Sequence, residues 1–221
     1  MLIACWAAKG GAGTTVVATA LARVLTSGAP AGALLADLAG DVPAVLGLPD
    51  PTGPGLAEWL AAGEDVPPDA LGRLEVEGPA GLRVLPWAGG PPAAAGSRLD
   101  ERASVLAAVL AADPRPTVVD CGTGPVGPGL VAASAATTSL LVLRPCYLAL
   151  RAALRAPLRP SGIVLVTEPG RALGAPEVEE ALGIPVRAVV GADPAVARAV
   201  DAGSLGDHLP RRLERAVRGA A

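Results

Sequence analysis

The chain has 221 residues, of which 51% are hydrophobic and 2% are aromatic, and it carries a formal net charge of −3. This length suits one α/β domain, residues 1–221, with enough chain to bury a core. The acidic charge argues against a generally basic nucleic-acid surface, and the few aromatics argue against binding of single strands by base stacking.

The apolar N-terminus, Met1 to Leu25, differs from a secretion signal because no positive charge precedes it and because Lys9 interrupts it. A second apolar run, Val131 to Leu143, is too short to span a bilayer. The three cysteines have no C-x-x-C spacing, which fits a reducing compartment and gives no metal site. We expect a cytoplasmic protein, with peripheral contact to a membrane as an open alternative.

A glycine-rich turn lies between a predicted strand, Leu2 to Trp6, and a predicted helix, Val16 to Leu25. This order of elements points backbone N–H groups and the positive end of a helix dipole at one spot, as phosphate binding requires. The candidate phosphate ligands are Lys9, Gly10, Gly11, Ala12, Gly13, Thr14 and Thr15.

The turn fits the pattern G-x-x-x-x-G-K-[ST] in part. Gly13 and Thr15 match the last glycine and the magnesium-binding hydroxyl, whereas Ala8 and Thr14 replace the first glycine and the lysine. Lys9 is the one lysine among 18 basic residues, which indicates that a compact ammonium is required there.

The sequence Lys9-Gly10-Gly11-Ala12-Gly13-Thr14-Thr15 resembles the deviant Walker A loop, K-G-G-x-G-K-[ST], of the MinD/ParA family of P-loop ATPases. The resemblance implies ATP and Mg2+ as cofactors and a homodimer in which Lys9 reaches the nucleotide of the partner subunit. Thr14 stands where the family has its second, phosphate-binding lysine. The resemblance therefore implies ATP binding in a dimer, with hydrolysis that is slow or absent.

Ala33 to Asp37 reads as a buried parallel strand that ends in a carboxylate. The following residues resemble the D-x-D-P-Q segment of the same family. Asp37 matches its first aspartate, while Ala39 replaces the second, which the family uses to position the attacking water. Asp41 is a candidate substitute, so the predicted catalytic residues are Lys9, Asp37 and Asp41.

The middle of the chain predicts several further elements. They are helices over Val42–Leu48, Gly55–Gly63 and Arg98–Ala112, a strand over Leu82–Pro86, and a mobile Gly/Pro/Ala linker over Ala88–Gly96. Trp59 in the second of these helices is expected to anchor the core. The strand Thr117–Gly122 contains Asp120 near its end, as a Walker B strand does, so Thr15 and Asp120 are the predicted metal ligands.

Two more buried strands are predicted at Ser139–Leu143 and Gly162–Val166, separated by a helix from Cys146 to about Pro157. This predicted helix contains Arg151 and Arg155, and Arg159 lies just beyond it, so the three arginines are spaced at i, i+4 and i+8. Such a stripe is typical of a solvated helix face, and contact with DNA phosphates or acidic lipid is the alternative.

A last strand, Ile184–Val190, precedes a segment that resembles the I-P-x-D-x-x-V-x-x-A element of MinD proteins, and especially of the CpaE/TadZ-like proteins of pilus assembly. The resemblance implies that Asp193 and Pro194 lie beside the adenine. Thr167 stands where family members often place a base-contacting asparagine. His208, the one histidine, has no neighbouring nucleophile and is not expected to be catalytic.

The C-terminal pattern sets three apolar residues against four arginines between residues 209 and 218. We expect this amphipathic helix to dock onto its own domain, with a membrane surface as the alternative.

Alternating strands and helices predict a doubly wound, mostly parallel α/β sheet with helices on both faces. The main functional hypothesis is an ATP-binding, dimerising protein of a positioning or assembly system (septum site, chromosome partitioning or pilus machinery) whose main ligand is a protein partner, with DNA and lipid contacts weak. The alternative is a nucleotide-free pseudo-ATPase scaffold. A P-loop kinase or synthetase is disfavoured because no lid or separate substrate region is evident.

Overall fold

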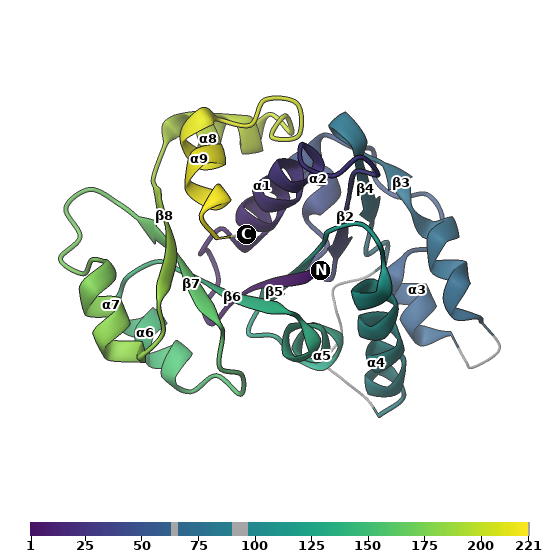
Figure 1. The fold of residues 1–221 in the computed structure, drawn as a ribbon, viewed down its shortest axis with the longest axis horizontal. Coiled ribbons are helices and arrows are strands. Elements are labelled where there is room, and N and C mark those ends of the chain that lie inside the picture. The colour runs from purple at the N-terminus through teal and green to yellow at the C-terminus, as the bar shows by residue number, and fades with distance from the viewer. Residues whose placement is uncertain (63–65, 90–96, 221) are drawn as a thin grey trace.

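The computed structural model of the protein describes residues 1–62, 66–89 and 97–220, and its centre is an eight-stranded sheet (Figure 1). The strand order is β3-β4-β2-β5-β1-β6-β7-β8, and every pairing is parallel except that of β3 with β4. The strands are β1 (Leu2–Ala7), β2 (Ala33–Asp37), β3 (Val76–Glu77), β4 (Leu82–Leu85), β5 (Thr117–Thr123), β6 (Thr138–Leu143), β7 (Gly162–Thr167) and β8 (Val186–Gly191). The predicted fold class is confirmed.

Helices cover both faces of the sheet. One face carries α1 (Thr14–Thr26), α2 (Val42–Leu46), α8 (Pro194–Asp201) and α9 (Arg211–Arg218). The other carries α3 (Leu56–Ala61), α4 (Ser97–Ala112), α5 (Gly127–Ala135), α6 (Tyr147–Leu154), α7 (Ala175–Leu182) and the 3-10 helix η1 (Pro68–Leu74); a second one, η2 (Pro79–Gly81), precedes β4. None of the helices within the described ranges has both the length and the apolar character needed to cross a bilayer.

The position of β1 in the middle of the sheet explains why its sequence is a continuous apolar run and not an alternating one. Its odd-numbered residues 3, 5 and 7 pack beneath α1, and its even-numbered residues 2, 4 and 6 pack beneath the helices of the opposite face. Both faces are dry, so every position is buried. Trp6 also donates its indole N–H to the Ser139 hydroxyl on β6, 3.0 Å away, which satisfies its one polar atom.

The predicted strands are all present, with ends that shift by one or two residues. Trp59 is 3% exposed and anchors the core, as expected. The elements η1, β3, η2, α5, α7 and α8 had no counterpart in the sequence prediction. Ala88 and Gly89 of the predicted mobile linker are described, but the rest of that linker lies outside the described residues.

The predicted helix from Cys146 to about Pro157 is too long, and this removes the arginine stripe. The helix α6 ends at Leu154, so Arg155 is its C-cap and Arg159 lies beyond it. Arg159 instead donates to the Gly183 carbonyl, 2.7 Å away. A stripe at i, i+4 and i+8 requires one continuous helix, and the three arginines therefore do not share a helix face.

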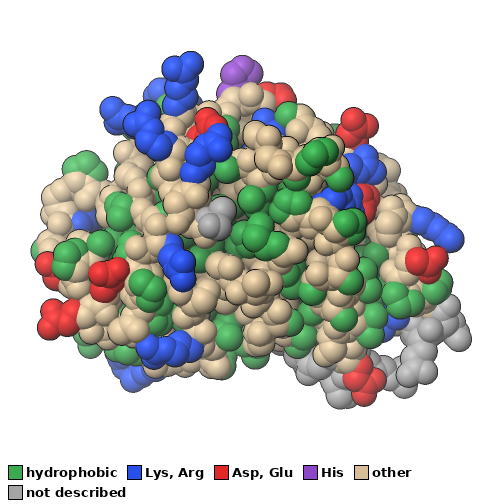
Figure 2. Space-filling view, in the orientation of Figure 1, with side chains coloured by type: hydrophobic (Ala, Val, Ile, Leu, Met, Phe, Trp, Pro, Cys, Tyr) green, Lys and Arg blue, Asp and Glu red, His purple; other side chains and the backbone are tan. Residues whose placement is uncertain are grey.

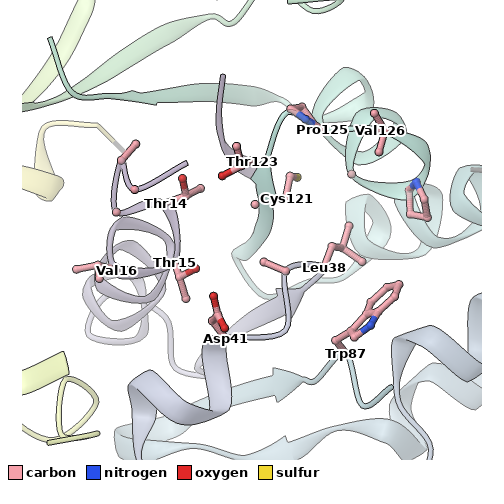
Figure 3. A pocket seen from close by; sticks show the side chains of 17 residues that line it. Thr14, Thr15, Val16, Leu38, Asp41, Trp87, Cys121, Thr123, Pro125 and Val126 are labelled. Atoms are coloured by element: carbon pink, nitrogen blue, oxygen red, sulfur yellow. The ribbon is translucent and has the colours of Figure 1, made fainter. Parts of the chain in front are cut away.

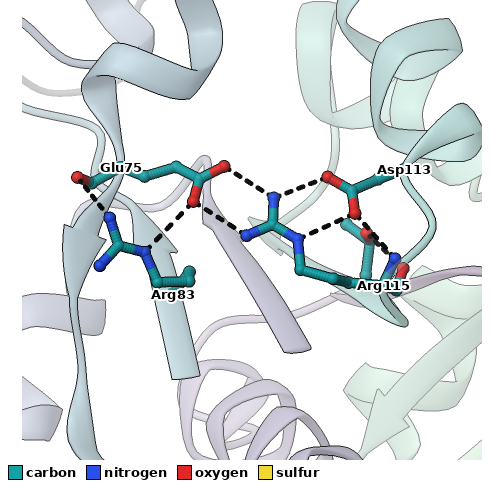
Figure 4. A network of polar contacts seen from close by, with 5 residues as sticks. Glu75, Arg83, Asp113 and Arg115 are labelled. Carbon is teal, nitrogen blue, oxygen red and sulfur yellow. Dashed lines mark hydrogen bonds and ion pairs between the residues drawn. The ribbon is translucent and has the colours of Figure 1, made fainter. Parts of the chain in front are cut away.

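An ion-pair network at the amino ends of the strands ties the β3–β4 edge of the sheet to its centre (Figure 4). The Arg115 guanidinium, just before β5, donates to both carboxylate oxygens of Glu75 at 2.9 and 2.7 Å and also pairs with Asp113. Arg83 on β4 donates to the same Glu75 carboxylate. Hydrogen bonds from Arg115 lower the pKa of both Glu75 and Asp113.

Replacing Arg115 with alanine is expected to lower the free energy of unfolding by about 2 kcal/mol, because two largely covered carboxylates lose their charge-assisted partners. Both carboxyls have pKa values below their ordinary 4.5 and 3.8 in the folded protein. The stability that they contribute is therefore complete above the ordinary values, and it is lost as the pH falls through the lowered values of the folded state. Urea unfolding at pH 7 and pH 3 tests this. The difference between the two proteins should shrink at pH 3, and Arg73→Ala, which removes an exposed arginine nearby, should change little at either pH.

Candidate functional site

The glycine-rich turn joins β1 to α1 at the carboxyl edge of the sheet. Gly11 and Gly13 have φ angles of 77° and 88°, and Gly13 is the N-cap of α1. A Cβ at either glycine would meet nothing within 4 Å, so conformation, not crowding, requires glycine there. Within the described residues, the N–H groups of Gly10, Gly11 and Gly13 donate no hydrogen bond. The turn is thus an open nest of donors at a helix N-terminus, suited to an anion.

A first cavity of about 500 Å³ opens beside this turn (Figure 3). Thr14 and Thr15 lie on its α1 side, with Trp87 and Leu38 across from them. Its lining comprises Gly11–Val16 of the turn and α1, Leu38, Ala39 and Asp41 after β2, Trp87 after β4, and Cys121–Thr123, Pro125, Val126, Pro128 and Gly129 after β5. All of these segments follow strands at one edge of the sheet, where doubly wound folds bind their ligands.

Asp120, on β5 beside this cavity, is fully buried and incompletely satisfied. Its Oδ1 accepts the Gly122 N–H at 3.0 Å, while among the described residues no donor, including the nearby Thr15 hydroxyl, makes a hydrogen bond of normal geometry with its Oδ2. Burial raises the pKa of Asp120 to about 7, and the charges of Asp37 and Asp41 also raise it. The Thr15 hydroxyl and the Gly122 N–H lower this pKa in part. An incompletely satisfied buried carboxylate close to a hydroxyl is a suitable position for a cation.

Mg2+ fits this position. Thr15 and Asp120 offer hard oxygen atoms, which Mg2+ prefers. No group of three or more His, Cys, Asp and Glu side chains in the described ranges could hold a metal ion alone. A magnesium ion here would therefore depend on ligand oxygens from a bound phosphate, as is usual for this ion.

The predicted catalytic aspartates lie in different surroundings. Asp37 is buried, and its carboxylate accepts the N–H groups of Ala39 and Gly40 at 2.9 and 2.6 Å and that of Val42 at 3.0 Å. These contacts shape the turn after β2, and Asp37 does not line the first cavity. Asp41 and Ala39 do line it, and Asp41 lies below Thr15 in Figure 3. Asp41 is thus the better placed of the two predicted carboxylates, and both catalytic roles stay predictions.

Lys9 is exposed and lines a second, smaller cavity of about 160 Å³ next to the turn, together with Arg144, Glu168 and Arg171. Arg144 and Arg171 both pair with Glu168, the latter at 2.8 Å. Among the described residues the Lys9 ammonium has no ion-pair partner. It is therefore an exposed cation available for contact with a second molecule at this edge of the turn.

A third cavity of about 370 Å³ adjoins the turn on its other flank, with Gly11–Gly13 and Val16 shared with the first cavity. Its remaining walls are mostly aliphatic, from Val17, Val166, Val190, Val196, Val200 and Leu213, with Arg144, Gly191–Asp193, Ala197 and Asp201. Asp193 caps α8 by accepting the Ala195 N–H at 2.8 Å. Pro194, the first residue of α8, does not line the cavity. An apolar slot beside a phosphate nest suits a nucleobase.

The C-terminal helix α9 docks on its own domain, as expected. Leu213 and Val217 are 2% and 0% exposed and pack in the core with β8 and α1. Arg211, Arg212 and Arg215 are exposed, and Figure 2 shows basic side chains gathered over α8 and α9. With its apolar face already buried, α9 has no second apolar face to insert into a lipid surface.

Sequence reasoning did not identify Trp87, Val126 or Arg144 as parts of these cavities. Trp87 directly follows the predicted strand Leu82–Pro86, and Arg144 directly follows Ser139–Leu143. Their positions after predicted parallel strands were a usable signal, because such residues gather at the carboxyl edge of a sheet.

No protein-family model matches the sequence, and no curated protein matches it. Solved structures match its fold. A ParA family ATPase from Chlorobium tepidum TLS matches with a TM-score of 0.76 at 19% identity over 98% of this chain and 95% of that chain. A chain of the MinC:MinD cell division protein complex from Aquifex aeolicus matches with a TM-score of 0.75 at 17% identity, over 99% of this chain and 93% of that chain. The septum site-determining protein MinD with Mg-ADP from Pyrococcus horikoshii OT3 matches with a TM-score of 0.73 at 19% identity, over 99% of this chain and 93% of that chain. The chain has the P-loop α/β fold of these ATPases.

Proposed function

We propose that the protein binds ATP with Mg2+, dimerises on the nucleotide, and serves a positioning or assembly system such as septum placement, partitioning or pilus machinery. The observation that carries the proposal is the meeting of two cavities at Gly11–Gly13, with the unpartnered Asp120 Oδ2 beside one of them. An anion nest, a buried carboxylate that can bind a cation and an adjoining apolar slot are the three parts that a Mg-nucleotide requires.

The chain's own residues divide the nucleotide between these cavities. The backbone N–H groups of Gly10 to Thr15 hold phosphate oxygens, and Thr15 and Asp120 hold Mg2+. The aliphatic third cavity takes the base, with Asp193 at its rim. Mg2+ supplies the charge that neutralises both the phosphates and the buried carboxylate. A MinD that shares the fold was solved with Mg-ADP, which supports a nucleotide and Mg2+ as the ligands.

Hydrolysis is slow or absent in this proposal, because two charged groups are missing from the first cavity. Thr14 offers no ammonium to the phosphates, and Ala39 offers no carboxylate to a water molecule. Stabilising the charge that develops during phosphoryl transfer is most of the catalysis in P-loop enzymes. Asp41 is the remaining carboxylate at the cavity wall, and its role would be limited to orienting water.

A protein surface is the proposed main partner, first a second copy of the chain and then a protein of the positioning system. The large apolar side chains Val126, Tyr147 and Leu148 are 58%, 72% and 56% exposed and follow β5 and β6 at the same sheet edge as the turn. We propose that these side chains are covered by protein in the assembled state, as a contiguous apolar surface would be. The MinC:MinD complex is a neighbour in fold that has a protein partner. We propose further that the chain belongs with the CpaE/TadZ-like proteins.

Replacing Lys9 with alanine is expected to leave nucleotide binding within about threefold of the parent but to abolish dimerisation on ATP, because the exposed ammonium faces outward from the turn and not into the first cavity. Calorimetry with ATP and Mg2+ measures the first quantity, and light scattering with and without ATP measures the second. Arg73→Ala removes an exposed cation that lines none of the three cavities, and this protein should dimerise like the parent.

Two results would contradict the proposal in different ways. Equal dimerisation of the Lys9→Ala protein and its parent would remove Lys9 from the dimer contact. Calorimetry that detects no binding of ATP to the parent, at protein and nucleotide concentrations up to the millimolar range, would favour the nucleotide-free scaffold instead.

A further inference from the structure

Arg144 is the feature of this site that neither the sequence motif nor the proposed division of the nucleotide uses. It directly follows β6, the strand next to β1, so its position is level with the start of the glycine-rich turn. Its Nη1 donates to the Gly11 carbonyl at 3.2 Å, and its Nη2 pairs with Glu168. The guanidinium is therefore fixed against the turn from outside by two acceptors on different elements.

Arg144 is also placed to act on a bound anion. It lines both the second and the third cavity, and the third is the one that shares Gly11–Gly13 with the first. Arg171 pairs with the same carboxylate but lines the second cavity alone. Of the two arginines on Glu168, Arg144 is thus the one that faces the proposed path of the nucleotide.

Through its contact with the Gly11 carbonyl, the Arg144 charge can polarise a peptide group of the turn. All peptide bonds of the described chain are trans, so the N–H of Ala12 points opposite to the Gly11 carbonyl that accepts from Arg144. A cation on the carbonyl polarises the peptide and makes its N–H a stronger donor. Ala12 lines all three cavities, so the polarised peptide borders the proposed path of the nucleotide.

We propose that Arg144 supplies, from outside the turn, part of the positive charge that Thr14 no longer provides, and that it acts on the phosphates nearest the base. This inference rests on the proposed nucleotide binding. Its position beside the third cavity, and not the first, means that it should act on ADP and ATP alike and contribute nothing to recognition of the terminal phosphate.

The test is calorimetry of ADP and of ATP with Mg2+ for the parent, Arg144→Ala, Arg144→Lys and the matched control Arg171→Ala. Losing one charge-assisted contact at a half-exposed position should weaken both nucleotides by roughly tenfold in Arg144→Ala. Arg144→Lys should recover most of the loss because it keeps the charge, and Arg171→Ala should stay within about twofold. The loss should shrink as salt rises from 0.05 to 0.5 M, since an exposed charge is screened.

A second arm separates charge from mere support of the turn. In a Thr14→Lys background the ammonium is restored, so the further change Arg144→Ala should reduce nucleotide affinity by a smaller factor than it does in the parent. Such non-additivity is expected of two groups that bind the same ligand. Equal costs in the two backgrounds, or an Arg144→Lys protein as weak as Arg144→Ala, would overturn the proposal in favour of a structural contact. Failure of the parent to bind either nucleotide would instead overturn the proposed function.

Discussion

Replacing Asp120 with asparagine is expected to stabilise the nucleotide-free protein at neutral and alkaline pH and to abolish the gain in affinity that Mg2+ gives to ATP. The carboxyl is fully buried, and its pKa of about 7 lies above the ordinary 3.8 because burial disfavours the charged form. The unfolded chain ionises near 3.8, so the folded state loses stability relative to it as the pH rises from about 4 to 7. Asparagine has nearly the same shape and no such titration.

The size of the effect follows from the pKa difference. Between pH 5 and pH 8 the free energy of unfolding of the parent should fall relative to that of Asp120→Asn by on the order of 3 kcal/mol. Urea unfolding of both proteins at several pH values measures this. The comparison across pH removes any constant effect of the amide group, which leaves only the titration.

A second readout uses the ligands. Mg2+ with ATP should remove most of the pH dependence of the parent, because the cation compensates the buried charge, and should stabilise Asp120→Asn no more than ATP does without Mg2+. Parallel pH profiles for the two proteins would show that Asp120 is already neutral or already compensated, and would remove the main argument for a cation at this position.

The loop and the sheet were predictable because their signals are local. Each buried strand is a short apolar run bounded by glycine, proline or a polar residue, and Gly11 and Gly13 have positive φ angles that the motif anticipates. The antiparallel strand β3 was not predictable, because a strand of two residues is too short to show an alternating pattern of apolar and polar residues. The end of α6 was missed because the arginines after Leu154 continue a helical spacing, whereas the prolines at 157 and 160 already restrict the chain before them.

The site was less predictable because its charges depend on tertiary neighbours. Resemblance assigned Asp37 to catalysis, yet three backbone N–H groups within five residues occupy its carboxylate. Asp41, two residues beyond the expected position, is the one at the cavity wall. The contact of Arg144 with Gly11 joins positions 133 residues apart, and a single sequence contains no local signal for it.

Restoring the two missing charged groups should have the largest effect on function. Thr14 lines the first cavity on the first turn of α1, and a lysine there would extend along the cavity wall toward the nest. One added charge-assisted contact to phosphate is worth roughly 1.5–3 kcal/mol, so Thr14→Lys should tighten ATP binding by roughly tenfold to a hundredfold. Thr52→Lys adds the same charge at an exposed position away from the cavity and should leave the affinity unchanged.

Adding Ala39→Asp to Thr14→Lys should then raise turnover, since Ala39 lines the same cavity as Asp41 and a carboxylate there could orient water. Phosphate release by the parent, each single variant and the double variant measures the effect, and the double variant should be the fastest. Ala39→Asp alone should gain little, because without the ammonium the developing charge on the phosphate remains unstabilised. A parent that already turns over several ATP molecules per second, a typical enzymatic rate, would show that Thr14 and Ala39 do not occupy the catalytic positions.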